Sequence, residues 1–409
     1  MFGFIAVRTR SVGAVSRSLP VMTGSWSILV ARCGRGWDAQ VPLPDVVGLA
    51  SADPRMHAVV LSHPHLDHYE LADQLDPAVP VYLGAEAERV LNAAAFFSPV
   101  SYTPRLAGHL ADRVSLQLRP FTVTPFLADH SAFDAYSLLI DAGGRRLFYT
   151  GDIRAHGCKR RLFDELVNHP PATDVLLMEG TNVRADSTLA TTSSVEDDLV
   201  ATFRATGGMV ATFSSAQNID RLVTVYRAAR RSGRTLVVDL YTATVAAATG
   251  RSTIPQPGFV GYAVYVPNRQ RHRIVQTREF HRVAEVTDIR MFPEGLATAR
   301  GTIAYLGTSS TAAELVDAGA LQGGAAVWSL WPGYLTQPSG LRFQQLLSEA
   351  EIPLLQHHTS RHAFVEDLQR LVATFDPARV VPIHSEATDH FADHFPRVDQ
   401  HPDGTWWKV

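Results

Sequence analysis

The chain has few cysteines, a small net charge and no long apolar run. Its 409 residues include only two cysteines, Cys33 and Cys158, which excludes a disulfide framework or a cysteine zinc module and fits a reducing, cytoplasmic location. The formal net charge of −3 argues against coating of nucleic acid by bulk charge, although a local basic cleft stays open. No apolar run is long enough to cross a bilayer, so no membrane partner is expected.

Acidic residues are also missing from the first 37 positions, which carry five arginines. Arginine-rich, acid-poor starts can resemble an organelle transit peptide. We favour instead an atypical, partly disordered N-terminal segment over residues 1–40, with a first strand within 25–31.

Histidine is concentrated at a few points of the chain. Residues 63–68 read HPHLDH and follow an apolar run at 57–61 that is typical of a buried strand. Alternate residues on an extended turn point the same way, so His63 and His65 can share one ion. Asp67 and His68 lie past the turn and can serve a second. Lone histidines are usually surface or core residues, but this density of potential ligands predicts a metal site.

The same pattern, an apolar strand followed by a ligand-type residue, occurs three more times, at His130, Asp152 and His384. Taken singly, each has an ordinary interpretation, such as a hydrogen-bonded histidine or an aspartate in a turn. Strand ends along one edge of a fold converge, however. The repetition therefore favours a shared metal centre.

The pattern of predicted strands and helices changes near residue 190. Residues 57–180 alternate short apolar runs with turns, which predicts packed sheets with helices outside. From there to about 350, strands alternate with helices, including an amphipathic helix at 219–231, which predicts βαβ units and a parallel sheet. We therefore expect an inserted α/β domain, followed by a helix at 363–375 and a strand at 379–383.

These motifs resemble the metallo-β-lactamase superfamily, and within it the β-CASP branch of nucleases that includes ribonuclease J. In chain order they are HPHLDH at 63–68, DHS at 129–131, GDIRAHG at 151–157, MEGT at 178–181, HTSRHA at 358–363 and PIHSE at 382–386. The resemblance covers roughly residues 45–409 and implies a four-layer αββα sandwich with an inserted α/β domain. The expected sandwich parts are 41–188 and 351–409, and the expected inserted β-CASP domain is 189–350.

The resemblance also implies which residues bind the metal ions. Two divalent ions are expected, zinc or alternatively manganese. Their implied ligands are His63, His65 and His130 for the first ion, Asp67, His68 and His384 for the second, and Asp152 as the bridge.

The implied chemistry is hydrolysis of a phosphodiester by a water activated between the two ions. Asp67 or Asp152 could take the proton of that water. His362 could stabilise the phosphate or protonate the leaving oxygen. Glu179 matches the acidic motif that orients a ligand histidine or the water network, and its alternative is an ordinary strand-end carboxylate.

A strand-to-helix junction at 213–221 suggests phosphate binding, because hydroxyl and amide side chains at a helix N-terminus favour an anion. Helix capping by Ser215 or Asn218 is the alternative. With two residues from the motif at 358–363, the candidates for binding a substrate phosphate are Ser214, Ser215, Asn218, Arg221, His358 and Arg361.

Two further features of the expected inserted domain could contact nucleic acid. Basic clusters at 227–234 and 269–273 could line a groove for a strand, or could be solvated helix faces. Trp328, Trp331 and Tyr334 could stack on bases, but we favour a packed turn for aromatic residues beside Pro-Gly.

Arg361 stands where the family usually has glycine. Arginine could strain that turn, shift His362 or grip a phosphate itself. If it strains the turn, Arg361→Gly should raise turnover.

Three functions remain open at this point. The favoured one is a zinc-dependent phosphodiesterase acting on RNA or single-stranded DNA. The others are a hydrolase of small esters, lactones or thioesters, and a catalytically weak nucleic-acid-binding homologue. Endo- or exonucleolytic action and oligomeric state are not determined.

Overall fold

The computed structural model divides the chain into two compact units. Unit 1 comprises Met1–Asn92, Val100–Thr188 and Arg361–Val409, and unit 2 comprises Ala93–Pro99 and Leu189–Ser360. The described residues are 5–6, 27–30, 43, 46, 48–51, 53, 56–69, 71–98, 103, 105–118, 120–183, 192–402 and 407, with the side chains of 5–6, 27–30, 67, 192 and 193 excepted. The domain boundaries predicted from the sequence stay predictions.

Unit 1 contains two sheets. All neighbouring strands of the first sheet are parallel. Its strands, in spatial order, are β1 (Ile5–Ala6), β2 (Ser27–Val30), β3 (Met56–Val60), β4 (Val81–Gly84) and β5 (Leu106–Leu110). The first strand expected within 25–31 therefore corresponds to β2.

The second sheet of unit 1 is mixed. Its strands, in spatial order, are β18 (Arg379–Ile383), β10 (Val175–Glu179), β9 (Arg145–Tyr149), β8 (Tyr136–Ala142), β7 (Phe121–Leu127) and β6 (Leu116–Leu118). The β18, β10 and β9 pairings are parallel, and the remaining pairings are antiparallel.

The two sheets pack face to face. Val60 and Leu110 of the first sheet share one buried cluster with Leu138 and Leu147 of the second. These positions alternate with outward-facing residues along their strands, as a half-buried strand requires. The sheet-on-sheet core thus lies between two layers of strands.

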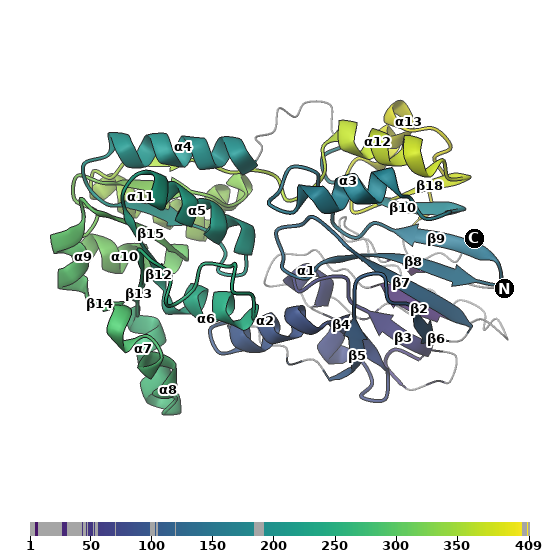
Figure 1. Ribbon diagram of the computed structural model, residues 1–409, viewed down its shortest axis with the longest axis horizontal. Coiled ribbons are helices and arrows are strands. Elements are labelled where there is room, and N and C mark those ends of the chain that lie inside the picture. The colour runs from purple at the N-terminus through teal and green to yellow at the C-terminus, as the bar shows by residue number, and fades with distance from the viewer. Residues whose placement is uncertain are drawn as a thin grey trace. The chain divides into compact units, whose positions relative to one another are not determined.

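Helices cover the outer faces. The buried residues Ala87 and Leu91 of α2 (Ala85–Ala95) pack on the first sheet. Phe163 of α3 (Arg160–Asn168) and Leu371 of α12 (Val365–Phe375) pack on the second (Figure 1). Unit 1 is therefore a four-layer αββα sandwich, which confirms the fold class expected from the sequence.

Unit 2 is a parallel α/β unit. Its strands, in spatial order, are β14 (Arg290–Met291), β13 (Tyr262–Tyr265), β12 (Thr235–Asp239), β15 (Ile303–Gly307), β11 (Val210–Phe213), β16 (Ala325–Trp328) and β17 (Leu354–Gln356). The expected β-α-β connection is present, but β15 lies between β11 and β12.

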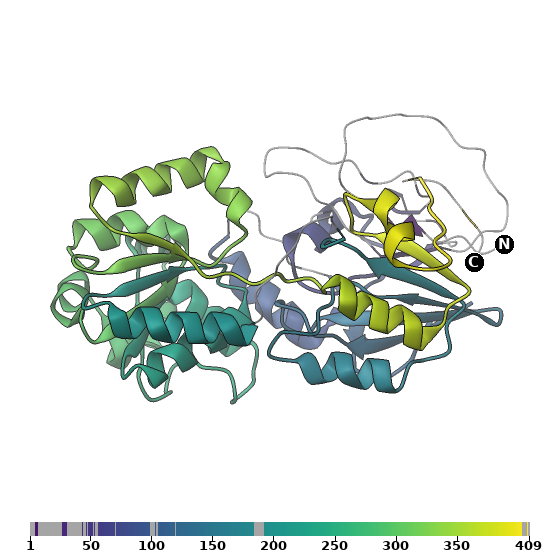
Figure 2. The ribbon, with the colours of Figure 1, turned by 90° about the horizontal axis from the view of Figure 1, so that it is seen from above.

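Helices cover both faces of this sheet, and Figure 2 shows α4 and α11 on opposite sides. One face carries α4 (Thr192–Ala205), α5 (Ile219–Arg231), α6 (Leu240–Ala248), α7 (Asn268–Thr277) and α8 (His281–Ala284). The other carries α9 (Pro293–Ala299), α10 (Ala312–Asp317) and α11 (Pro338–Glu349).

Among the described residues, no helix combines the length and the apolar character that a membrane span requires.

Candidate metal centre

One edge of the second sheet of unit 1 gathers the residues singled out in the sequence. Because β9, β10 and β18 are parallel neighbours, Asp152, Glu179 and His384, at or just after their ends, meet at this edge. The strand β7 runs in the direction of β9, since both are antiparallel to β8. His130, which follows β7, therefore reaches the same edge.

The histidine-rich segment arrives from the first sheet. It follows β3 and runs into the short helix α1 (Leu66–Tyr69). The backbone N–H of Tyr136 donates to the carbonyl of Ser62 at 2.9 Å, which ties this segment to β8 of the second sheet. The side chains of His63 and His68 are only 1% exposed.

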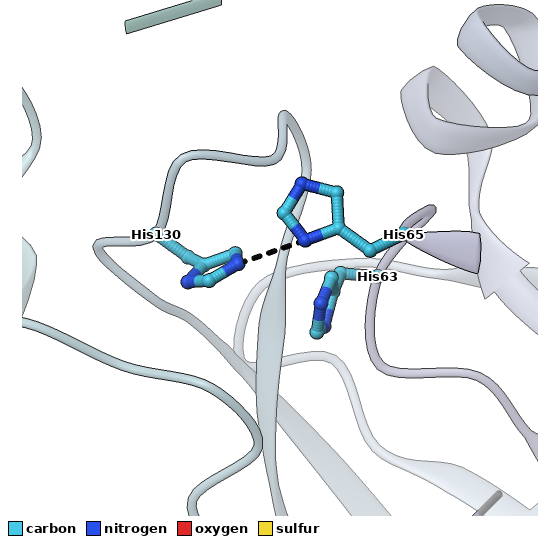
Figure 3. Close-up of side chains that lie close together, drawn as sticks. All are labelled: His63, His65 and His130. Atoms are coloured by element: carbon cyan, nitrogen blue, oxygen red, sulfur yellow. Dashed lines mark hydrogen bonds between the residues drawn. The ribbon is translucent and has the colours of Figure 1, made fainter. Parts of the chain in front are cut away.

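His63, His65 and His130 form a first group of potential ligands, with ligand atoms that all lie within 4.8 Å of one another (Figure 3). His65 Nδ1 and His130 Nε2 are 3.1 Å apart. Two nitrogens bound to one tetrahedral zinc ion at about 2.0–2.1 Å would be separated by about 3.3 Å. The spacing therefore fits a metal ion between the rings.

The electrostatic state of these imidazoles also fits a cation. Burial lowers the pKa of His65 well below its usual value, and the positive charge of Arg361 adds to the effect. Burial likewise lowers the pKa of His130, helped by the neighbouring His63 and His65. Neutral imidazole is the form that binds metals.

Asp152 lies between imidazoles on both sides. Its Oδ2 atom is 3.3 Å from His68 Nε2 and 3.8 Å from His63 Nε2. Its Oδ1 atom is 3.5 Å from His384 Nδ1. Its Oδ2 atom thus faces one imidazole predicted for each ion, His63 and His68, which is compatible with the predicted bridging role.

Glu179 is fully buried and connects three segments. Its Oε1 atom accepts hydrogen bonds from the backbone N–H groups of Ile153 and Ala363, each at 3.2 Å. Its Oε2 atom lies 3.2 Å from His362 Nδ1. Glu179 is thus placed to orient His362 and the loop that carries Asp152.

His362 lies close to the carboxylate of Asp152, a position that its expected role at the substrate phosphate did not require. Its Nδ1 atom is 3.9 Å from Asp152 Oδ2, and His362, His384 and Asp152 form a further group of potential ligands. Asp67 belongs to α1, but its side chain lies outside the described part of the structure.

The sequence did not predict which groups lie within hydrogen-bond distance of the Nδ1 atoms of these imidazoles. Ser62 Oγ is 3.1 Å from His63 Nδ1 and 3.4 Å from His68 Nδ1. The carbonyl of Arg361 lies 2.9 Å from His130 Nδ1, where it accepts if that nitrogen is protonated. Because a carbonyl can only accept, the Arg361 partner favours the His130 tautomer that leaves Nε2 for an ion. The only signal for Ser62 in the sequence is its place directly before the histidine-rich segment.

His384 has a left-handed backbone conformation with a φ of +54°, which non-glycine residues seldom adopt. Thr181 Oγ1 donates to the carbonyl of His384 at 3.0 Å and also contacts His384 Nδ1. The contacts with Thr181 thus hold His384 in an uncommon backbone conformation. Residues with such conformations occur often at functional sites.

The candidates for phosphate binding in unit 2 differ in burial, and one of them caps a helix. Asn218 Oδ1 accepts from the N–H of Arg221 at 3.0 Å and so caps α5. Ser214 and Arg221 are buried, at 2% and 3% exposure, whereas Ser215 is exposed. The capping alternative is present in the structure, and phosphate binding stays a prediction, as it does for the half-buried His358 and Arg361.

The first basic cluster has structural roles as well. Arg234 donates to the carbonyls of Gly208 and Ile303, and Arg231 pairs with Glu196 and Asp197 on the surface. The cluster at 269–273 lies on α7, where Arg269 and Arg271 are exposed.

The aromatic residues beside Pro-Gly divide into two groups. Trp328 is buried in the core of unit 2, whereas Trp331 is 44% exposed and meets Tyr334 edge to face. The packed-turn interpretation therefore describes Trp328 better than Trp331.

Two family models match segments of the chain. Residues 35–222 match the model of the beta-lactamase superfamily domain, and residues 356–400 match the model of the Zn-dependent metallo-hydrolase RNA specificity domain. A ribonuclease J of Sinorhizobium meliloti (strain Sm2011 / Rm2011 / 2011) is 26% identical over 204 residues, which are 48% of this chain and 36% of that protein. The match thus spans about a third of the length of this curated relative.

A solved structure supports the fold. The crystal structure of a protein of unknown function from Enterococcus faecalis V583 has a TM-score of 0.70 and 22% sequence identity, and the similarity covers 86% of this chain and 80% of that one.

The sandwich, the imidazole-lined edge and the two matched segments together resemble a metallo-hydrolase with an RNA specificity domain. More specifically, the matched segments and the curated relative support a resemblance to the metallo-β-lactamase superfamily, in its β-CASP, ribonuclease J-like branch.

Proposed function

We propose that this protein is a metal-dependent phosphodiesterase that cleaves RNA, with single-stranded DNA as the alternative substrate. The observation that carries the proposal is a cluster of five imidazoles and one carboxylate, all buried except the half-buried His65. Those side chains are His63, His65, His68, His130, His384 and Asp152.

The donor set matches two divalent cations, zinc or alternatively manganese, because imidazole and carboxylate suit both. Ions held there would supply Lewis acidity and a water molecule of lowered pKa. His63, His65 and His130 would hold one ion, and His68 and His384, with Asp67, the other. Asp152 would bridge them.

The remaining residues would handle the proton and the phosphate. Asp152 or Asp67 takes the proton from the attacking water. His362, with Nδ1 directed at Glu179 Oε2, keeps Nε2 available to protonate the leaving oxygen. Arg361, the neighbour of His362, adds a permanent positive charge that favours a phosphodiester over a neutral ester.

Similarity to other proteins supports RNA as the substrate. The RNA specificity domain model covers His358, Arg361, His362 and His384, and a curated relative is named ribonuclease J. The match covers only part of that relative, so its activity supports the proposal without establishing the substrate. A cytoplasmic location and the expected RNA partner belong to the same proposal.

The decisive experiment combines elemental analysis with cleavage assays. RNA and DNA oligonucleotides labelled at the 5′ or the 3′ end, together with bis-nitrophenyl phosphate, are incubated with and without chelator. We expect two metal equivalents per chain, and RNA cleavage that chelator abolishes and zinc or manganese restores. The lengths of the labelled products distinguish endo- from exonucleolytic action.

Two outcomes would contradict the proposal. Cleavage that survives complete metal removal would exclude the metal-dependent mechanism. Turnover of lactones or thioesters without turnover of any phosphodiester would favour the small-molecule hydrolase instead.

A further inference from the structure

Two loops carry the ligands that face each other across the candidate metal centre. One contains His130 and the other contains Asp152. We propose that Asp129, Arg154 and Gly157 form a clamp that sets the distance between these loops and so the affinity of the site for its metal. The inference rests on the proposed metal centre, and the clamp residues act as positioning residues.

Three hydrogen bonds make up the clamp. The N–H of Gly157 donates to Asp129 Oδ2 at 2.8 Å, and Arg154 Nε donates to Asp129 Oδ1 at 3.4 Å. The N–H of Arg154 donates to the carbonyl of Asp129 at 2.8 Å. Asp129 precedes His130, and Arg154 follows Asp152 by two positions. Any change in the clamp therefore moves one ligand relative to the other.

The clamp consists of buried charges. Asp129 is 1% exposed and Arg154 is 2% exposed. A buried ion pair gains little net stability, because desolvation of both charges offsets their attraction. Its contribution here is geometric: a planar guanidinium and a carboxylate hold a defined separation and orientation.

Gly157 lets the two charged groups approach each other and the backbone. A Cβ atom at this position would lie 2.2 Å from Asp129 Oδ1 and 2.3 Å from Arg154 Nε. Both distances are far shorter than any van der Waals contact. A methyl group at residue 157 would therefore act as a wedge that separates the pair without changing any charge.

A second anchor continues the clamp on the His130 side. Lys159 Nζ donates to the carbonyls of His130 and Ala132, at 2.7 and 3.1 Å. The segment 154–159 thus fixes the loop before, at and after His130. Outer partners of metal ligands typically change metal affinity by about 10- to 100-fold when they are removed.

The test uses the wedge and a matched glycine. Gly157→Ala introduces the methyl group into the clamp, whereas Gly207→Ala introduces it where no heavy atom lies within 4 Å. Zinc affinity is measured by chelator competition on the full chain. Imidazole ¹⁵N spectra report the tautomer of His130. We expect affinity to fall by about 10-fold or more in Gly157→Ala and to stay unchanged in Gly207→Ala.

Two further variants keep the test decisive if Gly157→Ala fails to fold. Asp129→Asn retains an oxygen acceptor for the Gly157 N–H but removes the charge, and Arg154→Lys retains the charge but removes the planar group. We expect both to weaken zinc binding, with part of the affinity kept in Arg154→Lys. Melting of the metal-free protein separates lost affinity from lost folding.

Unchanged zinc affinity in folded Gly157→Ala or folded Asp129→Asn would overturn the clamp. A protein that binds zinc in a clamp-dependent way but cleaves no RNA would overturn only the proposed function. A protein that binds no divalent ion would overturn both.

Discussion

The two units use buried polar residues in different ways. In unit 1, the buried imidazoles of His63, His68 and His130 face other ligand-type side chains. In unit 2, buried Arg234 donates to backbone carbonyls, and Asp239 accepts from the backbone of Thr242 and so caps α6. Polar groups used by the backbone stabilise a fold, whereas polar groups that face one another leave capacity for a ligand.

The same topology underlies both arrangements. Parallel strands of each unit end at a common edge, so the residues that follow these strands lie close together there. In unit 2 this edge receives Ser214 after β11, Asp239 at the end of β12 and Thr308 after β15, and the N–H of Thr308 donates to Asp239 Oδ2 at 3.4 Å. Burial raises the pKa of Asp239. An edge by itself therefore does not make a metal site; facing ligand atoms do.

The largest expected effect is in unit 1. Asp152→Asn and His65→Ala should each lower RNA cleavage by at least about 1,000-fold, because each removes a metal ligand and with it the activated water. RNA binding should change far less, since these side chains hold the ions. Single-turnover cleavage and equilibrium binding of labelled RNA measure the two effects separately.

An exposed histidine provides the control for these variants. His169 lies at the end of α3 and is exposed, so His169→Ala should cleave at the normal rate. Cleavage at the wild-type rate by Asp152→Asn would show that the ligand assignment is wrong.

Arg361→Gly should have the next largest effect. Arg361 is not among the residues with positive φ, so glycine has no left-handed strain to relieve at this position. We therefore expect RNA affinity to fall about 10-fold through loss of one charged phosphate contact, without the rise in turnover that a strained turn would predict. Dissociation constants at several salt concentrations, together with kcat, test this.

Arg361→Lys is the matched variant, because it keeps the charge and removes the planar guanidinium. Its RNA affinity should lie between those of the wild type and Arg361→Gly. Faster turnover in Arg361→Gly would show that arginine impairs the site.

A smaller effect should separate helix capping from phosphate binding in unit 2. Asn218→Ala should lower the free energy of unfolding by about 1 kcal/mol through loss of the cap on α5. Asn218→Asp keeps a capping oxygen but adds negative charge where a phosphate is predicted to bind. It should therefore retain stability and bind RNA several-fold more weakly. Equal RNA affinity in Asn218→Asp and the wild type would leave capping as the whole role.

The smallest effect is expected at the surface of unit 2. Arg231 pairs with Glu196 and Asp197 at exposed positions, so Arg231→Gln should change neither melting temperature nor RNA affinity measurably. Arg269→Gln, on the basic surface of α7, should reduce the slope of log affinity against log salt by about one unit if RNA contacts this helix. Equal salt slopes for the two variants would argue that α7 is a solvated face.

Local patterns in the sequence predicted many elements well. The helix α5 and the strand β18 have the predicted bounds, because each is a short periodic run with clear ends. The position of β15 between β11 and β12 was not predicted, since strand order depends on contacts between distant parts of the chain. The ligand motifs were found for a similar local reason: their histidines and aspartates follow apolar strands.

The sequence by itself determined the class of chemistry, because imidazole and carboxylate groups at these spacings have few uses other than binding a cation. Its short apolar runs also predicted packed sheets with helices outside, and the family resemblance of its ordered motifs implied the sandwich fold. Only the tertiary structure decided which atoms face each other: Ser62 behind His63 and His68, Glu179 beside His362, and Asp129 against Arg154. Such contacts either join residues far apart in the chain or depend on the conformation of a loop. The spacing of residues along the sequence predicts neither.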